Sequence, residues 1–181
     1  MAAGLESLDA GNKLVRLFFA AWPPPRAAQA LGAWASEVAE TSGGKLVRVE
    51  NIHLTLAFLG EADPTKAIAA AKAVGGRKHE LPIDAARYWK KNKIVWVGPA
   101  RIPGELSALA GELHDRLPSA GFVLEERPFA AHITLLRNAR VPASIPPLPT
   151  VRWPVNEFLL VQSRTSPKGS IYERLERFTL S

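Results

Sequence analysis

The chain has 181 residues, of which 47% are hydrophobic and 22% charged, as is usual for a globular protein with one core. The absence of cysteine excludes disulfides, thiolate metal sites and cysteine nucleophiles. The net charge of +6 favours an anionic partner such as a phosphate, although ordinary solubility explains it equally well. No apolar run is long enough to span a bilayer, and Met1 to Lys13 lacks the apolar segment of a secretory signal. We therefore expect a cytoplasmic protein, monomeric and without a membrane partner.

The pattern of apolar residues, glycines and prolines predicts alternating strands and helices after a loose tail over residues 1–12. Gly43 and Gly44 end the first helix, and Pro118 ends the third. Asp63 caps the short second helix, with Pro64 at its first position. In chain order we expect a strand at 15–20, a helix from the prolines at 23–25 to 39, a strand at 52–59, a short helix at 64–74, a hairpin of 83–89 and 94–97, a helix at 104–117, a strand at 131–136, and final strands at 157–162 and 171–180.

One tetrapeptide occurs twice in this order of elements. His53-Leu54-Thr55-Leu56 returns as His132-Ile133-Thr134-Leu135. Residues two apart in a strand share a face, so each copy presents a histidine and a hydroxyl together. A single copy would usually be a buried strand histidine bonded to a neighbour, but a chance repeat among four histidines has a probability of roughly 1%. The pair suggests a site that holds an oxyanion between two proton-transfer groups.

The elements around the tetrapeptides also repeat. A strand, a helix and a His-x-Thr strand occur over residues 14–59 and again over 94–136. Two copies related by a pseudo-twofold axis would bring the motif strands together in one cleft. We therefore expect a single two-lobed domain over residues 1–181.

The motifs and their flanks resemble those of the two-histidine phosphoesterase superfamily, and within it the bacterial RNA 2′,3′-cyclic phosphodiesterases, also called 2′-5′ RNA ligases. Ala131 departs from the family, which usually has proline before the second histidine, and this change threatens no chemistry. The matching residues are Arg16 to Ala20 with the prolines that follow, Asn51 to Gly60, Trp96 to Pro99, Arg127 to Phe129, His132 to Arg137, and Ser163, Gly169 and Tyr172.

The resemblance implies an α+β bilobal fold, with two antiparallel sheets facing a central cleft and helices outside. It also implies hydrolysis of terminal RNA 2′,3′-cyclic phosphates to 2′-phosphates without metal or other cofactor. His53 would be the proton donor and His132 the proton acceptor. Histidine suits both roles because its ordinary pKa is near 6.5. Thr55 and Thr134 would donate hydrogen bonds to the phosphate oxygens.

Arg137 is a further phosphate-binding candidate by resemblance. It lies five residues beyond His132, so regular alternation puts it on the opposite face of the strand. It could reach phosphate only if the strand bends or ends, and the alternative is a surface ion pair. Phe19 and Phe129 could stack on a base, or could pack in the core instead.

Several other residues remain open. Tyr172 is a possible substrate contact. The lysines of turn 90–93 could follow an RNA backbone, but a solvated turn explains them as well. His79 and His114 have no partner at a telling spacing and fit surface or capping positions.

Other functions also remain open. A metalloenzyme would need a third ligand that the motifs lack, because threonine is a weak ligand. A non-catalytic RNA-end-binding module would have no need for two acid–base positions. Within the enzyme class, the same groups could support 2′-5′ RNA ligation or 2′-5′ phosphodiester cleavage.

Overall fold

A computed structural model describes residues 13–181, and the tail expected over 1–12 lies outside the described residues. The longer elements follow the predicted order, and four short ones over residues 45–46, 49–51, 79–80 and 154–155 were not predicted. In chain order the elements are β1 (Val15–Ala21), α1 (Pro25–Ser42), β2 (Lys45–Leu46), the 3₁₀ turn η1 (Val49–Asn51), β3 (Leu54–Ala62), α2 (Pro64–Ala71), β4 (His79–Glu80), β5 (Ala85–Trp89), β6 (Ile94–Gly98), α3 (Gly104–Ser119), β7 (Ile133–Arg137), β8 (Pro154–Val155), β9 (Glu157–Ser166) and β10 (Gly169–Thr179).

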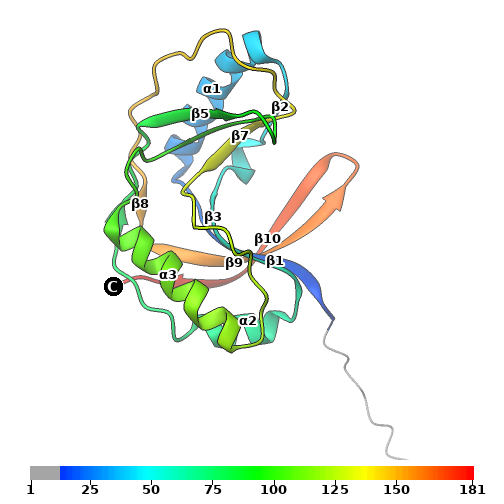
Figure 1. Cartoon of the computed structure of the whole chain (residues 1–181), viewed down its shortest axis with the longest axis vertical. Helices are drawn as coiled ribbons and strands as arrows, with labels where there is room; N and C mark the ends of the chain where they lie inside the picture. Colours follow the sequence, from blue (N-terminus) through cyan, green and yellow to red (C-terminus); the bar gives the residue numbers. More distant parts are fainter. Residues whose placement is uncertain (1–12) are drawn as a thin grey trace, which may run out of the picture.

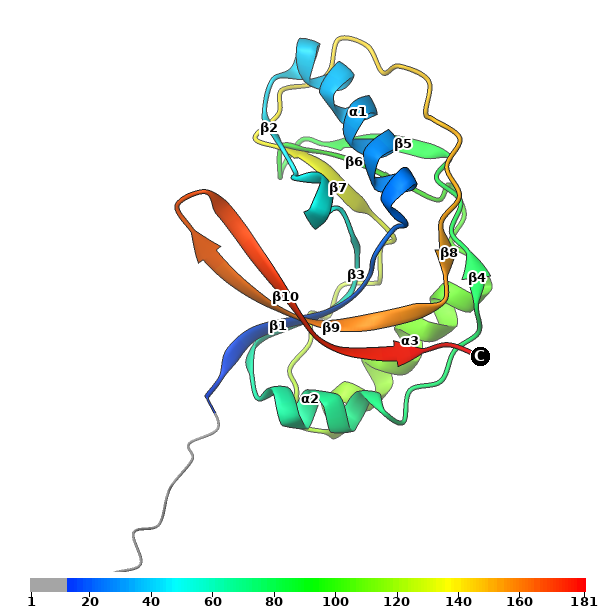
Figure 2. The same cartoon turned by 180° about the vertical axis from the view of Figure 1, so that it is seen from behind.

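Two four-stranded antiparallel sheets form the body. In Figures 1 and 2, β5 and β7 of one sheet lie above β1 and β9 of the other. One sheet has the order β10-β9-β1-β3 and the other the order β2-β7-β6-β5. Each sheet therefore contains one motif strand, β3 or β7. A small pair, β4 and β8, makes a separate two-stranded sheet. The predicted α+β class with two antiparallel sheets is confirmed.

The long helices are exchanged between the two halves of the chain. α1 follows β1 in sequence but contacts β2 and β7 of the other sheet, and α3 follows β6 but contacts β3. Figure 1 shows α1 beside β5 and β7, with α2 and α3 at the opposite end beside β9 and β1. Most buried side chains of both lobes belong to one hydrophobic cluster, while Phe18, Ala20, Leu159 and Val161 form a second, smaller one. Because each half covers the other half's sheet, the two motif strands are held within one packed body.

Most helix boundaries follow from local chemistry. Gly43 ends α1 with a φ of 61°, a conformation that glycine adopts at low cost. The Asp63 side chain accepts a hydrogen bond from the Thr65 N–H at 2.9 Å, which confirms the predicted cap. α2 ends at Ala71, three residues earlier than expected. The expectation that Pro118 ends α3 was wrong, since the helix continues through Pro118 to Ser119.

Each motif strand has a β-bulge directly after its threonine. In β3, Thr55 pairs with Ala20 and Ala57 with Phe19, which leaves Leu56 without a partner in the register. In β7, Leu135 is likewise skipped between Thr134 and Leu136. A bulge adds one residue and resets the alternation of side chains. Positions five residues after each histidine therefore return to the face of the histidine and threonine.

The carbonyl of each bulge residue has its own donor. The Val47 backbone N–H donates to Leu135 O at 2.9 Å. In the other half, the His114 ring on α3 donates through Nε2 to Leu56 O at 3.2 Å. His114 is therefore half-buried inside α3 rather than at a surface or helix-capping position as expected, and it ties an exchanged helix to the first motif strand.

We expect Gly98→Ala to destabilise the protein, because a Cβ at this position would overlap Ala131 O directly before His132. Forcing these backbones apart should lower the free energy of unfolding by about 1–3 kcal/mol. Gly111→Ala is the matched control, since Gly111 lies inside α3 with nothing within 4 Å of the added carbon. It should raise stability by about 0.5–1 kcal/mol. Urea denaturation measures both, and equal stability of Gly98→Ala and the parent would contradict the close approach.

Candidate active site

The two motif histidines lie close enough to act on each other electrostatically. A positive charge on His132 lowers the pKa of His53, although the two residues are far apart in sequence. Each histidine directly precedes its strand, at the N-terminal end of β3 or β7. The duplicated elements therefore bring the two motifs to one place, as their repetition predicts.

Hydrogen bonds to carbonyl groups determine which nitrogen of each neutral ring carries the proton. His53 Nδ1 lies 2.6 Å from Asn51 O, and His132 Nδ1 lies 3.0 Å from Ala130 O. A carbonyl can only accept, so both Nδ1 atoms are donors and both Nε2 atoms are bare in the neutral form. His53 Nε2 accepts a hydrogen bond from the Thr55 hydroxyl at 3.0 Å.

His53 is enclosed by aromatic rings. The Trp22 ring stacks on it at 4.7 Å between ring centres with planes 16° apart. Phe18 and Tyr172 lie at 5.1 Å and 5.3 Å. Burial among these groups lowers the pKa of His53 to about 4, although the Asn51 carbonyl partly offsets this by stabilising the cation. His53 is therefore neutral at pH 7 in the free protein.

His132 also lies beside aromatic rings, but they are different residues from those around His53. Its ring lies 4.7 Å from Trp89 and 6.1 Å from Trp96. Burial lowers the pKa of His132, the hydrogen bond to the Ala130 carbonyl raises it in part, and the charges of Arg137 and Arg127 lower it further. The free site thus holds two neutral imidazoles with bare Nε2 atoms.

Arg137 lies with the histidines because of the bulge in β7. Regular alternation would turn its side chain to the opposite face, but the skipped Leu135 returns it to the face of Thr134. Its charge lowers the pKa of both histidines. Among residues 13–181 it forms no ion pair, so the surface ion pair considered from the sequence is absent there.

The matching position in the first motif strand makes the site asymmetric. Phe58 follows His53 by five residues, as Arg137 follows His132. Its side chain is 52% exposed, and its ring lies 5.9 Å from Phe18. One half of the pseudo-symmetric site therefore presents an aromatic ring where the other half presents a cation.

The three aromatic residues considered as substrate contacts have different positions. Phe19 is fully buried and packs against Phe158 and Phe178, so its assignment as a possible substrate contact was wrong and the core alternative holds. Phe129 is half-buried against the main core. Tyr172 is half-buried beside His53, where a substrate contact remains a prediction.

Sequence reasoning missed Trp22, Phe18 and Trp89. A signal for the first two was present, because Phe18, Ala20 and Trp22 alternate along one face, whereas Phe19 lies on the other. That alternation identifies the face beside His53 only once Ala20 is known to pair with Thr55 in the neighbouring strand, and the sequence does not reveal this pairing. The predicted lysine turn is a solvent-exposed turn next to Trp89.

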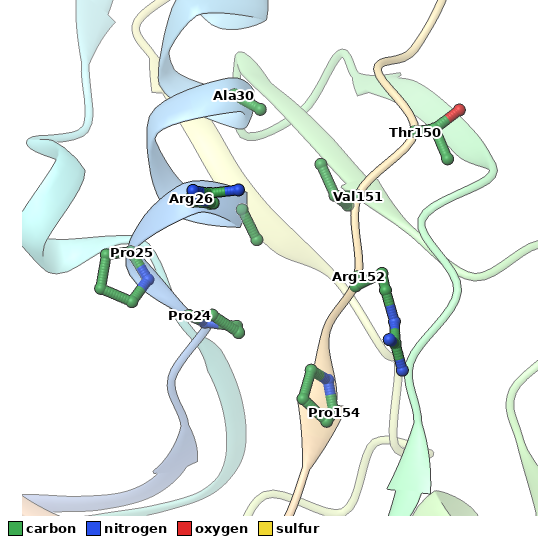
Figure 3. Close-up of a pocket in the computed structure, with 9 residues that line it drawn as sticks. Pro24, Pro25, Arg26, Ala30, Thr150, Val151, Arg152 and Pro154 are labelled. Atoms are coloured by element: carbon green, nitrogen blue, oxygen red, sulfur yellow. The ribbon is translucent and has the colours of Figure 1, made fainter.

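A groove elsewhere contains none of the predicted site residues. It lies between the first turn of α1 and the segment 150–154, and proline and aliphatic side chains form most of its walls (Figure 3). Of the two arginines at its edge, Arg152 is ion-paired with Glu80 at 3.0 Å. Within residues 13–181, no three His, Cys, Asp or Glu side chains are grouped to hold a metal ion. No helix in that range has the length and apolar character required to cross a membrane.

Comparison with known families decides between the broad classes. A profile described as LigT-like phosphoesterase matches twice, over residues 22–96 and 97–172, so that each half of the chain carries one copy. This chain belongs to the LigT-like phosphoesterase family. The two matches agree with the duplication expected from the repeated elements.

Relatives of this LigT-like phosphoesterase include proteins named RNA 2′,3′-cyclic phosphodiesterase. That of Escherichia coli is 34% identical over 92% of this chain and 97% of its own. The protein of the same name from Thermus thermophilus is also 34% identical, over 92% of this chain and 90% of its own. A crystal structure of E. coli LigT complexed with 3′-AMP superposes with a TM-score of 0.86 at 32% identity, covering 93% of this chain and 99% of that chain.

The depressed pKa of His53 makes stability depend on pH. Between pH 6.5 and about 4 the unfolded chain binds a proton at His53 that the folded LigT-like phosphoesterase does not. The free energy of unfolding should therefore decrease on acidification through this window, by about 3 kcal/mol from this group. His53→Gln should lack this component when unfolding is compared at pH 7 and pH 4. Identical pH dependence in the two proteins would contradict the burial of a neutral His53.

The hydrogen bond from His114 to the carbonyl of Leu56 can be tested by its contribution to stability. His114→Phe removes the N–H that pairs with Leu56 O and should lower the free energy of unfolding by about 1–3 kcal/mol, because a carbonyl is left unsatisfied. His114→Gln keeps an N–H donor on a side chain of similar reach and should recover most of that loss. Urea unfolding of the parent and the two variants measures these differences in the free energy of unfolding. Equal losses in His114→Gln and His114→Phe would show that the packing of the ring matters rather than its hydrogen bond.

Proposed function

We propose that this protein hydrolyses terminal RNA 2′,3′-cyclic phosphates to 2′-phosphates by metal-independent acid–base catalysis. His53 is the proton donor and His132 the proton acceptor, while Thr55, Thr134 and Arg137 bind the phosphate. The observation that carries this proposal is the pairing of two bare Nε2 atoms, one from each half of the chain, with one arginine that has no ion-pair partner among the described residues.

In this mechanism water attacks phosphorus opposite the departing O3′. His132 Nε2 takes a proton from the water, and His53 Nε2–H gives one to O3′ as the P–O3′ bond breaks. The product is a terminal 2′-phosphate. Arg137 and the two threonine hydroxyls stabilise the negative charge that develops on the non-bridging oxygens.

When the substrate binds, His53 takes up from solvent the proton that it donates. In the free protein His53 lacks a proton at pH 7, because its pKa is about 4. A phosphodiester anion beside the two rings favours the imidazolium form and raises both pKa values. Protonation of His53 Nε2 also ends its role as acceptor for Thr55, so the hydroxyl hydrogen becomes available to a phosphate oxygen.

Replacement of either histidine tests the assignment directly. His53→Ala and His132→Ala should each lower kcat by about 10² to 10⁴-fold on an oligoribonucleotide ending in a 2′,3′-cyclic phosphate, while circular dichroism stays unchanged. Phosphorus NMR of the parent reaction should show a 2′-phosphate. A 3′-phosphate as the main product would mean that the substrate binds reversed, and the assignment of His53 as donor and His132 as acceptor would have to be re-examined.

The pH dependence of kcat/KM follows from the lowered pKa values. The form of the free protein that can react carries one proton on the two histidines together, whereas the form that predominates at pH 7 carries none. Both histidine pKa values lie below 6.5, so the reactive form becomes more abundant at acidic pH. The optimum of kcat/KM should therefore lie on the acidic side of pH 6.5, with a decline of about tenfold per pH unit well above it. The kcat profile should be displaced to higher pH by the bound anion. A kcat/KM that still increases above pH 7 would rule out this protonation scheme.

Metal independence is a separate part of the proposal. Turnover should survive exhaustive dialysis against EDTA, because arginine and hydroxyl groups supply the charge stabilisation. Activity that disappears with chelation and returns with a divalent ion would refute this part. Buffer exchange without chelator is the control.

Two alternatives use the same site. For 2′-5′ ligation, an RNA 5′-hydroxyl would replace water as the nucleophile, and a ligated product would appear when both ends are supplied. A non-catalytic RNA-end-binding module would bind the cyclic phosphate without turnover. The parent protein and His53→Ala would then both show only the uncatalysed rate of hydrolysis.

A further inference from the structure

The outer part of the β9–β10 hairpin, residues 163–174, forms an arm beside His53. Figures 1 and 2 show this hairpin extending away from the rest of its sheet. The arm reaches the site through Tyr172, whose ring is 5.3 Å from that of His53. The Asn51 side chain donates to Ser170 O at 3.0 Å, and the Asn51 carbonyl holds His53 Nδ1. The arm is therefore fixed to the residue that sets the His53 tautomer.

Arg174 lies on the face of the arm that carries the aromatic groups. The register places Arg174 opposite Val161, Val161 opposite Phe18, and Phe18 opposite Phe58, so the four form one row across the sheet. The Arg174 guanidinium carbon lies 5.1 Å from the centre of the Trp22 ring. The Trp22 ring in turn lies 4.7 Å from the His53 ring. The distance from the Arg174 guanidinium to the His53 ring therefore cannot exceed the sum of the Arg174–Trp22 and Trp22–His53 distances.

Arg174 differs from the other arginines of its hairpin in lacking an acidic partner. Arg164 is paired with Glu173 at 3.0 Å, and Arg177 with Glu157 at 3.1 Å. Among residues 13–181 Arg174 forms no ion pair, and it is exposed. A planar guanidinium that stacks on an aromatic face keeps its N–H edge free to bind two oxygens of an anion such as a phosphate.

We infer that Arg174, held against Trp22, binds the phosphate on the 5′ side of the terminal nucleotide. This inference rests on the proposed function, which puts the reacting cyclic phosphate at the two histidines beside Arg137. The next phosphate of an RNA strand is one nucleotide away, a separation that falls within the upper limit set by the Arg174–Trp22 and Trp22–His53 distances. The site then recognises an RNA chain end rather than a free nucleoside cyclic phosphate.

Three substrates isolate this contact. They are a nucleoside 2′,3′-cyclic phosphate with a 5′-hydroxyl, the same nucleoside with a 5′-phosphate, and a dinucleotide ending in the cyclic phosphate. Arg174→Ala should lower kcat/KM by about 5- to 30-fold for the second and third, as expected for one charged contact, and by less than about twofold for the first. Arg174→Lys keeps the charge without the planar fork and should lie between.

Arg164→Ala is the matched control. It removes one positive charge from the same hairpin, but Arg164 pairs with Ile171 and so lies on the face opposite Tyr172. It should change none of the three reactions by more than about twofold, since surface ion pairs contribute little.

Two outcomes would overturn the inference. An equal loss on all three substrates would mean that Arg174 acts on His53 through Trp22, and no loss on any would mean that it contacts no phosphate. If the parent protein hydrolyses none of them, the proposed function fails. Fluorescence anisotropy with an oligoribonucleotide ending in a 2′-phosphate then tests Arg174 alone. Arg174→Ala, unlike Arg164→Ala, should weaken that binding and reduce the slope of its salt dependence by about one phosphate contact.

Discussion

The hydrogen bond from Nδ1 of each motif histidine to the carbonyl two residues earlier is the constraint on which the site depends. It fixes the tautomer, so the same nitrogen, Nε2, is bare in both neutral rings. Without it, one ring could present a donor where the chemistry needs an acceptor. The bond also partly offsets the effect of burial on each pKa, because a carbonyl stabilises the protonated ring.

The backbone around these bonds is organised by the two bulges and the exchanged helices. Each bulge returns a side chain five residues beyond the histidine to the site, as Phe58 in one half and Arg137 in the other. The duplicated halves thus supply two equivalent histidines and two different neighbours. We expect this difference to favour one orientation of the substrate, because a base can stack on an aromatic ring whereas a phosphate pairs with a cation.

The sequence predicted the parts of this arrangement that depend on local pattern. The His-x-Thr repeat, the order of the longer strands and helices along the chain, and the Asp63 cap all follow from alternation, spacing and composition. The face of Arg137 could not be assigned, since a bulge is set by pairing with a neighbouring strand. For the same reason Phe19 was considered as a substrate contact, whereas Phe18 and Trp22 are the aromatic residues at His53. The exchange of α1 and α3 is likewise a tertiary choice that amphipathic patterns do not reveal.

In the proposed mechanism both histidines are neutral in the free protein, and a bound phosphate raises their pKa values so that one of them becomes protonated. Nitrogen NMR of the imidazole rings, titrated with and without an oligoribonucleotide ending in a 2′-phosphate, tests this directly. We expect a pKa of about 4 for His53 in the free protein, a pKa below 6.5 for His132, and an upward shift of both pKa values when the phosphate binds. A His53 ring that is already protonated at pH 7 without ligand, or that does not respond to the phosphate, would contradict this mechanism.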